Sequence, residues 1–102
     1  MDSGAYSIIG GMNNTIKGTT SSSLIVGHNN ISTREDAIIA GAYNQTTDHL
    51  FVLGNGNNNE ERHNAFSVDY DGKIYVNGST TGVDVKDLLD RIVALEAAVE
   101  AL

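Results

Sequence analysis

Four copies of one short pattern occupy residues 7–57, and this repeat constrains the fold more than any other feature of the chain. Each copy has a small or apolar residue, two large apolar residues, one variable residue, a glycine, two variable residues and an asparagine. The copies are residues 7–14, 23–30, 37–44 and 50–57. Their glycines (Gly11, Gly27, Gly41, Gly54) and their asparagines (Asn14, Asn30, Asn44, Asn57) recur at the same spacings of 16, 14 and 13 residues. Two fixed positions at four matching places indicate repeated supersecondary units.

Each repeat is predicted to be a short strand that ends in a turn. Ile, Val, Leu and Phe fit a pleated, half-buried surface, and glycine and asparagine tolerate the positive φ that a tight turn needs. A weaker fifth copy covers residues 65–72, with Gly72 in the asparagine slot. One unit has too few large apolar side chains to bury them alone, so stacked neighbours must share a core. We expect that core to contain Ile9, Ile25, Ile39 and Val52.

The length of the repeat limits how such a core can be closed. At about 3.3 Å per residue, 13 to 16 residues make two short strands and two turns. A coil of this length is too short to enclose an interior by itself. The aromatic content is also low, at 6%. We therefore expect three chains to supply one wall each, so that the core is sheltered only in a homotrimer.

Residues 7–18 and 23–30 resemble the head repeats of YadA-like trimeric autotransporter adhesins, which also occur in bacteriophage tail fibres. The resemblance covers about residues 5–60. It implies a mostly β fold in which each chain winds a left-handed parallel β-roll and three chains pack into a trimeric β-prism. The sequence departs from the family pattern because its repeats are bulkier than the usual Ala/Ser/Gly-rich ones and vary in length.

Residues 61–82 are predicted to form a β-hairpin connector after the repeat segment of residues 1–60. Asp71-Gly72 is a strong turn signal between two alternating runs. The sequence leaves the register open, because a two-residue loop would place Tyr70 opposite Lys73 and mix the two faces. The stretch from Leu53 to Val68, followed by Asp-Gly, is similar to phage tail and fibre proteins.

A heptad pattern in residues 83–102 predicts a C-terminal coiled coil. Its apolar seam has the spacing 3, 4, 3, 4, 3 and consists of Val85, Leu88, Ile92, Leu95, Val99 and Leu102. Asp84 is a plausible N-cap, and Asp87 in the first turn suits the helix dipole. An isolated helix of this length is marginal in water, so a partner is required.

The number of strands in the coil is less directly specified. β-Branched residues at a with leucine at d favour a dimer, whereas Leu89 and Val93 widen the apolar face. Arg91 and Glu96 resemble the ends of the R-h-x-x-h-E trimerisation motif, which implies that Arg91 reaches Glu96 of the next chain. The alternative for this pair is an ordinary surface ion pair. A threefold head demands threefold symmetry of the coil, so the trimer is favoured.

No pattern indicates a catalytic, cofactor-binding or metal-binding site. The histidines are His28, His49 and His63. A β-helix acyltransferase would use one histidine at a subunit boundary as a general base, but His28 occupies a freely varied slot and the coils are too short for that class. Residues 54–56 lack the third glycine of a dinucleotide loop. A ring of histidines or asparagines that binds an ion on a threefold axis is a further alternative.

Asp69-Tyr70-Asp71-Gly72 begins like a calcium loop, but such a loop needs a glutamate at its twelfth position. That position is Thr80, so a plain turn is favoured. The chain has no cysteine for a disulfide or a thiolate site. A net charge of −7 with six scattered basic residues argues against nucleic acid as a partner. Apolar runs of four or five residues argue against membrane insertion.

These features together predict a structural and adhesive segment of a phage or prophage tail fibre, located on the virion tail. It would bind a cell-surface polysaccharide or protein receptor, for which no residue can be named. One alternative is a passenger segment of a bacterial trimeric autotransporter adhesin at the cell surface. Others are a β-helix acyltransferase and a self-assembling scaffold without a ligand. Because the chain starts within a repeat and stops on a seam leucine, we expect a fragment of a longer fibre.

Overall fold

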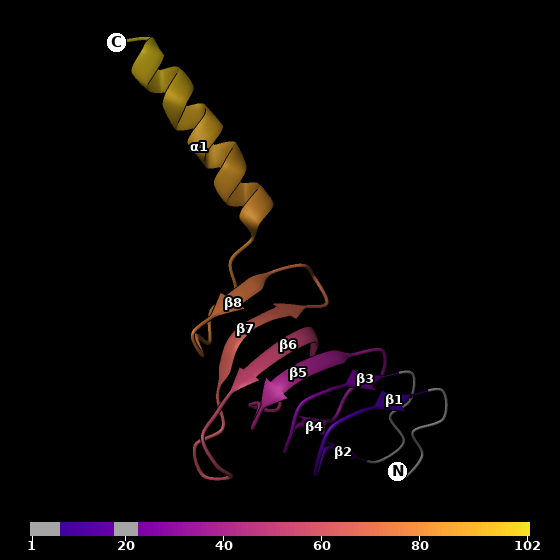
Figure 1. Cartoon of the computed structure of the whole chain (residues 1–102). Helices are drawn as coiled ribbons and strands as arrows, with labels where there is room; N and C mark the ends of the chain where they lie inside the picture. Colours follow the sequence, from indigo (N-terminus) through magenta and orange to yellow (C-terminus); the bar gives the residue numbers. More distant parts are fainter. Residues whose placement is uncertain (1–6, 18–22) are drawn as a thin grey trace.

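The computed structural model describes residues 7–17 and 23–102, which form short strands followed by one helix (Figure 1). The strands are β1 (Ile8–Ile9), β2 (Thr15–Ile16), β3 (Leu24–Ile25), β4 (Ile31–Ser32), β5 (Ile38–Ala42), β6 (His49–Asn55), β7 (Asn64–Asp69) and β8 (Ile74–Val76). Helix α1 (Val85–Glu100) projects from the end of the β body that holds β8 (Figure 1). The mostly β fold with a C-terminal helix that the sequence predicts is confirmed.

The repeats stack as parallel strands of one sheet. Its strand order is β1-β3-β5-β6-β7-β8, and β2 and β4 pair in a second, two-stranded sheet. The register joins equal positions of all four repeats: Ile8, Leu24, Ile38 and Phe51 in one row, and Ile9, Ile25, Ile39 and Val52 in the next. The pairing therefore follows the alignment of the repeats in the sequence.

A small core lies within the single chain. Ile25, Ile39 and Val52 are buried, and Ile9 packs against them. Ile16 of β2 belongs to the same cluster, so the second sheet helps to close the interior. The expectation that only neighbouring chains can shelter these residues is therefore wrong for the three buried ones.

Polar side chains explain how so short a coil closes on itself. The buried polar residues are Ser23, Asn30, Ser32, Asn44, Asn64 and Ser67. Asn14, Asn30, Asn44 and Asn64 form what we call the asparagine ladder. The Asn30 amide nitrogen Nδ2 donates to the carbonyls of Val26 (3.1 Å) and Gly41 (2.9 Å). The Asn30 oxygen Oδ1 accepts from the backbone N–H of Asn44 at 3.3 Å, and the backbone N–H of Asn30 donates to Asn14 Oδ1 at 3.1 Å. Each ladder amide thus pairs backbone groups that a narrow apolar interior would leave unsatisfied.

The repeat asparagines do not take the positive φ that the sequence suggested for them. In the first three repeats that conformation falls on the residue before the asparagine, at Asn13 (56°), Asn29 (56°) and Tyr43 (45°). In the fourth repeat Asn57 is exposed, and the ladder position passes to Asn64, whose Oδ1 accepts from the N–H of Gln45 at 2.8 Å. The asparagine is required for its amide group and not for its backbone conformation.

Replacing Asn30 with alanine is expected to cost about 2 to 3 kcal/mol of unfolding free energy, because buried carbonyl and N–H partners lose their hydrogen bonds. Asn57→Ala is the matched control, since Asn57 is exposed and its side chain donates to the exposed carboxylate oxygen Glu61 Oε2 (3.1 Å) and not to a buried backbone group. Its effect should stay within about 0.5 kcal/mol. Urea denaturation followed by circular dichroism measures both. Equal losses in the two variants would mean that the ladder does not stabilise the stack.

The predicted hairpin is confirmed and extends the main sheet. β7 pairs antiparallel with both β6 and β8, so the sheet continues across the expected boundary at residues 60 and 61. The backbone N–H of Asp69 donates to the Lys73 carbonyl at 3.0 Å, which leaves residues 70–72 as a three-residue loop with Gly72 at φ 84°. The extra loop residue keeps Val68 opposite Ile74. The two faces of the hairpin therefore stay separate, whereas a two-residue loop would mix them.

The carboxylate of Asp69 serves this turn. Its Oδ1 accepts from the backbone N–H groups of Asp71 (2.9 Å) and Lys73 (3.0 Å). Such bonds from an aspartate to the amides that follow it are characteristic of tight turns. The geometry agrees with the turn interpretation of residues 69–72.

Candidate functional site: an apolar sheet face and a polar pocket

The main sheet presents two rows of apolar residues on the side opposite the core. Successive residues of a strand point to opposite faces. Of the two consecutive large apolar residues in each repeat, one therefore points into the core and the other points outward. We call this surface the outer apolar face. Its first row is Ile8, Leu24, Ile38, Phe51, Val68 and Ile74, and its second row is Gly10, Val26, Ala40, Leu53, Phe66 and Val76.

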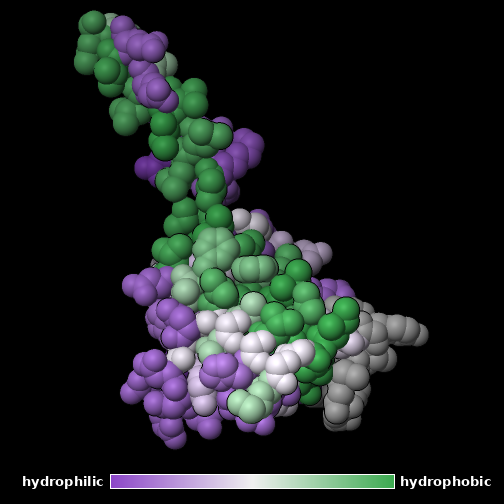
Figure 2. Space-filling model, viewed as in Figure 1, coloured by the Kyte–Doolittle hydropathy of each residue, from purple (hydrophilic) through white to green (hydrophobic). Residues whose placement is uncertain are grey.

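Much of this face is open to solvent. The exposed fractions are 67% for Ile8, 44% for Ile38 and 54% for Val76. Figure 2 shows apolar surface over the sheet and along the helix. Single exposed apolar residues are ordinary, but a continuous patch of this extent marks an interaction surface. The signal in the sequence was the two consecutive large apolar residues of each repeat, of which only one can point into the core.

Helix α1 carries a second unpartnered apolar surface. Asp84 Oδ1 accepts from the N–H of Asp87 at 3.1 Å, which confirms the predicted N-cap. No residue of the helix is buried, and every predicted seam position is at least 41% exposed: Val85, Leu88, Ile92, Leu95, Val99 and, after the helix, Leu102. The side chains of Leu88, Arg91, Ile92 and Leu95 line a shallow groove.

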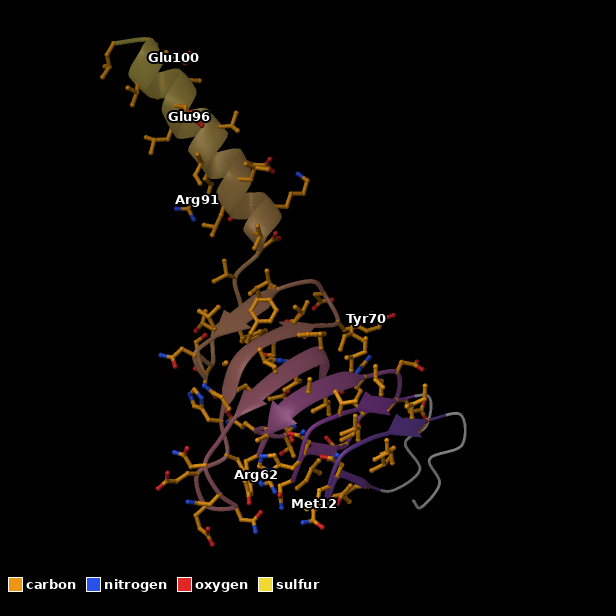
Figure 3. All side chains as sticks on the ribbon, in the orientation of Figure 1. Met12, Arg62, Tyr70, Arg91, Glu96 and Glu100 are labelled. Carbon is orange, nitrogen blue, oxygen red and sulfur yellow. The ribbon has the colours of Figure 1, made fainter. Side chains whose placement is uncertain are left out.

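Arg91 and Glu96 lie on the exposed helix, away from the strands (Figure 3). Within the chain, Arg91 Nη1 is 4.0 Å from Asp87 Oδ2, and both side chains are mostly exposed. An exposed pair at that distance contributes little to stability. The guanidinium therefore remains largely exposed on the surface of the helix.

On the core side of the sheet, the hairpin half differs from the repeat half. The inner row Ile9, Ile25, Ile39 and Val52 continues as Ser67 and Tyr75. At this change lies a polar pocket of about 260 Å³, lined by Gln45, Thr47, His49, Asn64, Ser67, Tyr75, Gly78, Ser79 and Thr80. We refer to it as the inner pocket.

The side chains of the inner pocket hold one another in place. His49 Nδ1 lies 2.8 Å from Ser67 Oγ, and Ser67 is only 2% exposed. The rings of His49 and Tyr75 are stacked, with centroids 4.3 Å apart and an interplanar angle of 31°. The Tyr75 hydroxyl donates to Asp69 Oδ2 at 2.8 Å. Strands β6, β7 and β8 thus contribute to one fixed polar cluster.

The ionisation of this cluster follows from its hydrogen bonds. Burial tends to raise the pKa of Asp69, but the bonds from Tyr75 and from the backbone amides of Lys73 and Asp71 outweigh it, so this pKa lies below its ordinary value. The hydrogen bond to Asp69, and then burial, raises the pKa of Tyr75. At neutral pH the carboxylate is charged and the phenol is protonated. The lining of the pocket contains no Lys, Arg, Asp or Glu and consists mainly of hydroxyl, amide and ring groups that donate or accept hydrogen bonds.

The histidines singled out in the sequence lie in three separate settings. His28 Nδ1 is 3.2 Å from Asn29 Oδ1, and its ring meets the edge of Tyr43. His63 Nδ1 is 2.5 Å from Asn55 Oδ1. His49 alone lines the inner pocket. No pattern in the sequence indicated that His49 would lie beside Ser67 and Tyr75.

Neither a metal-binding cluster nor a membrane-spanning helix occurs in the described residues. Within residues 7–17 and 23–102, no three His, Cys, Asp or Glu side chains are grouped so that they could hold a metal ion. In the same ranges, no helix is both long and apolar enough to cross a membrane. Comparison of the chain with protein families, curated proteins and solved structures finds no match.

Proposed function

We propose that this chain is one protomer of a parallel homotrimer that forms a structural, receptor-facing segment of a phage or prophage tail fibre. The observation that carries the proposal is the outer apolar face, which crosses six strands and which residues 7–17 and 23–102 leave partly open to solvent. A sheet that is apolar on both faces is typical of one buried on both faces. A second and a third copy of the chain are the natural cover.

The outer apolar face and the apolar surface of α1 both contribute to the free energy of association. Completing the burial of a half-exposed Leu, Ile or Val contributes about 1 kcal/mol, and Ile8, Val26, Ile38, Leu53 and Val76 are each at least 40% exposed. The gain from the face is therefore about 5 kcal/mol per chain, which is comparable to the cost of association. The helix alone is marginal at this length. Burial of both surfaces together makes association favourable.

The arrangement of the chain favours parallel association around one axis. In each chain α1 leaves the β body after β8, so chains whose outer faces meet in parallel also bring their helices together. The wide apolar surface of α1 and the exposed Arg91 suit three helices better than two. In such a coil, Arg91 would pair with Glu96 of the next chain and its aliphatic stem would cover the core.

A passenger segment of a bacterial trimeric autotransporter adhesin is the second candidate. The resemblance of residues 7–18 and 23–30 applies to those adhesins as well, and the same outer face would close the same trimer. The location would then be a bacterial cell surface. In both candidates the chain holds a shape and presents a surface to a receptor.

Light scattering on the purified chain tests the assembly. We expect a mass about three times the 10.8 kDa of the chain. Two sheets packed face to face would bury the same residues in a dimer, so a mass of twice the chain would contradict the trimer. A monomer at micromolar concentration would overturn both the assembly and the fibre function.

A further inference from the structure

We infer that the inner pocket binds one neutral sugar ring, so that a trimer presents three equivalent saccharide sites. The number of sites rests on the proposed trimer, whereas the chemistry of each site rests on one chain alone. The pocket gives the proposed receptor a chemical class and a place.

The position of the pocket leaves it accessible in the assembly. Ser67 and Tyr75 point to the core side of the sheet, whereas their neighbours Phe66 and Val76 belong to the outer apolar face. Adjacent residues of a strand point in opposite directions. Packing of the outer faces around an axis therefore leaves the pockets on the surface of the assembly.

The lining matches the hydrogen-bonding character of a sugar. Gln45, Thr47, Ser79 and Thr80 provide amide and hydroxyl groups, which both donate and accept. Sugar hydroxyls offer the same dual character. The volume of about 260 Å³ lies just below the roughly 300 Å³ of pockets for larger ligands, which suits a single ring.

The electrostatics favour an uncharged ligand. The lining contains no Lys, Arg, Asp or Glu, and the ring of His49 is already hydrogen-bonded to Ser67, so an anionic sugar or a phosphate would find no Lys or Arg to pair with there. The charged carboxylate of Asp69 lies behind Tyr75 at 2.8 Å from its hydroxyl and would repel an anion further. A neutral hexose or N-acetylhexosamine avoids both penalties.

The site is preorganised by contacts that need no ligand. Ser67 holds the imidazole of His49, and Asp69 holds the phenol of Tyr75. These bonds fix the two stacked rings as one rigid wall. Binding then loses little side-chain entropy. Repetition on three chains would multiply a weak single-site affinity on a polymeric glycan.

NMR titration of the intact chain tests the site. The probes are glucose, galactose and N-acetylglucosamine at millimolar concentration, with inorganic phosphate as the anionic control. We expect at least one sugar to shift the resonances of His49, Tyr75 and Thr80, and phosphate to leave them unchanged. Binding of phosphate at these residues, or no shift with any of the three sugars, would overturn the inference.

Two tryptophan variants provide a matched test. Thr80→Trp fills the pocket from an exposed loop, whereas Thr81→Trp makes the same change at the next exposed residue, which does not line the pocket. The first should weaken binding of the responding sugar at least tenfold and the second less than twofold, while circular dichroism shows both folded. Equal affinity in the two variants would place the sugar elsewhere.

The mass of the same sample separates this inference from the fibre proposal. A trimer whose pocket residues respond to none of the sugars refutes the pocket and leaves the assembly standing. A monomer that binds a sugar at His49, Tyr75 and Thr80 supports the pocket and refutes the trimer. Binding to immobilised neutral polysaccharide, compared with the free monosaccharide, then shows whether valency strengthens the interaction.

Discussion

Replacing Gly27 with alanine is expected to destabilise the chain by at least about 4 kcal/mol, because it combines backbone strain with a collision that cannot relax. Gly27 has a φ of 111°, and a Cβ atom at this position would overlap the carbonyl group of Gly41 in the next repeat. Both groups belong to the backbone of stacked repeats. Relief therefore requires the repeats to separate.

The effect of packing can be isolated with a second glycine. Gly72 has a φ of 84°, but a Cβ there would meet nothing within 4 Å. Gly72→Ala should cost only about 1 kcal/mol of backbone strain. Thermal denaturation of both variants at one protein concentration measures the difference, since assembly makes the midpoint depend on concentration. Similar losses would show that close approach of the glycines is not essential.

Replacing Ile92 with aspartate is expected to convert the proposed trimer into monomers. Ile92 lies at the centre of the apolar seam of α1 and is 53% exposed in the single chain. In a parallel coil, three carboxylates would converge at one level of the axis. Burial of unpaired like charges costs several kcal/mol per ion, which is more than the short helix can offset.

Ala97→Asp is the control for helix propensity, because position 97 lies on the opposite side of the heptad from the seam. It introduces the same side chain into the same exposed helix. Sedimentation at micromolar concentration should give a trimer for Ala97→Asp and a monomer for Ile92→Asp. An Ile92→Asp variant that stays trimeric would mean that the sheet faces, and not the coil, hold the assembly together.

Local signals in the sequence were sufficient for the strands, the hairpin and the helix cap. The spacing of Gly11, Gly27 and Gly41 gave the stacking of the repeats because each of these glycines contacts the next one directly. Asp71-Gly72 gave the turn, and Asp84 gave the helix start. Each of these features depends on residues close in sequence or on a motif that recurs along the chain.

The closure of the core could not be predicted in this way. Counting apolar side chains suggested that one chain has too little interior, because it treated Asn30 and Asn44 as turn residues. In the structure their amides fill the interior and pair the backbone of successive repeats. Burial of a polar side chain depends on the partners it meets in three dimensions, and a pattern of residue types does not reveal them.

The inner pocket was missed for a related reason. His49, Ser67 and Tyr75 come from three consecutive strands, β6, β7 and β8, and none of them belongs to a recognisable motif. The available signal was the inner row of the sheet, which changes from Val52 to Ser67. That signal becomes visible only when the antiparallel register of β6 and β7 is known.

The stacked repeats and the helix use their residues in different ways. Each added repeat advances the sheet by one strand spacing of about 4.8 Å, although it contains 13 to 16 residues. The same number of residues in a helix spans about 20 Å. For each ångström along the stacking direction, the β body therefore adds width and lateral surface area, whereas α1 adds mainly length. In a filament that alternates the two, short helices can set the distance between successive β bodies. The contact surface is then concentrated on a few wide, rigid β bodies.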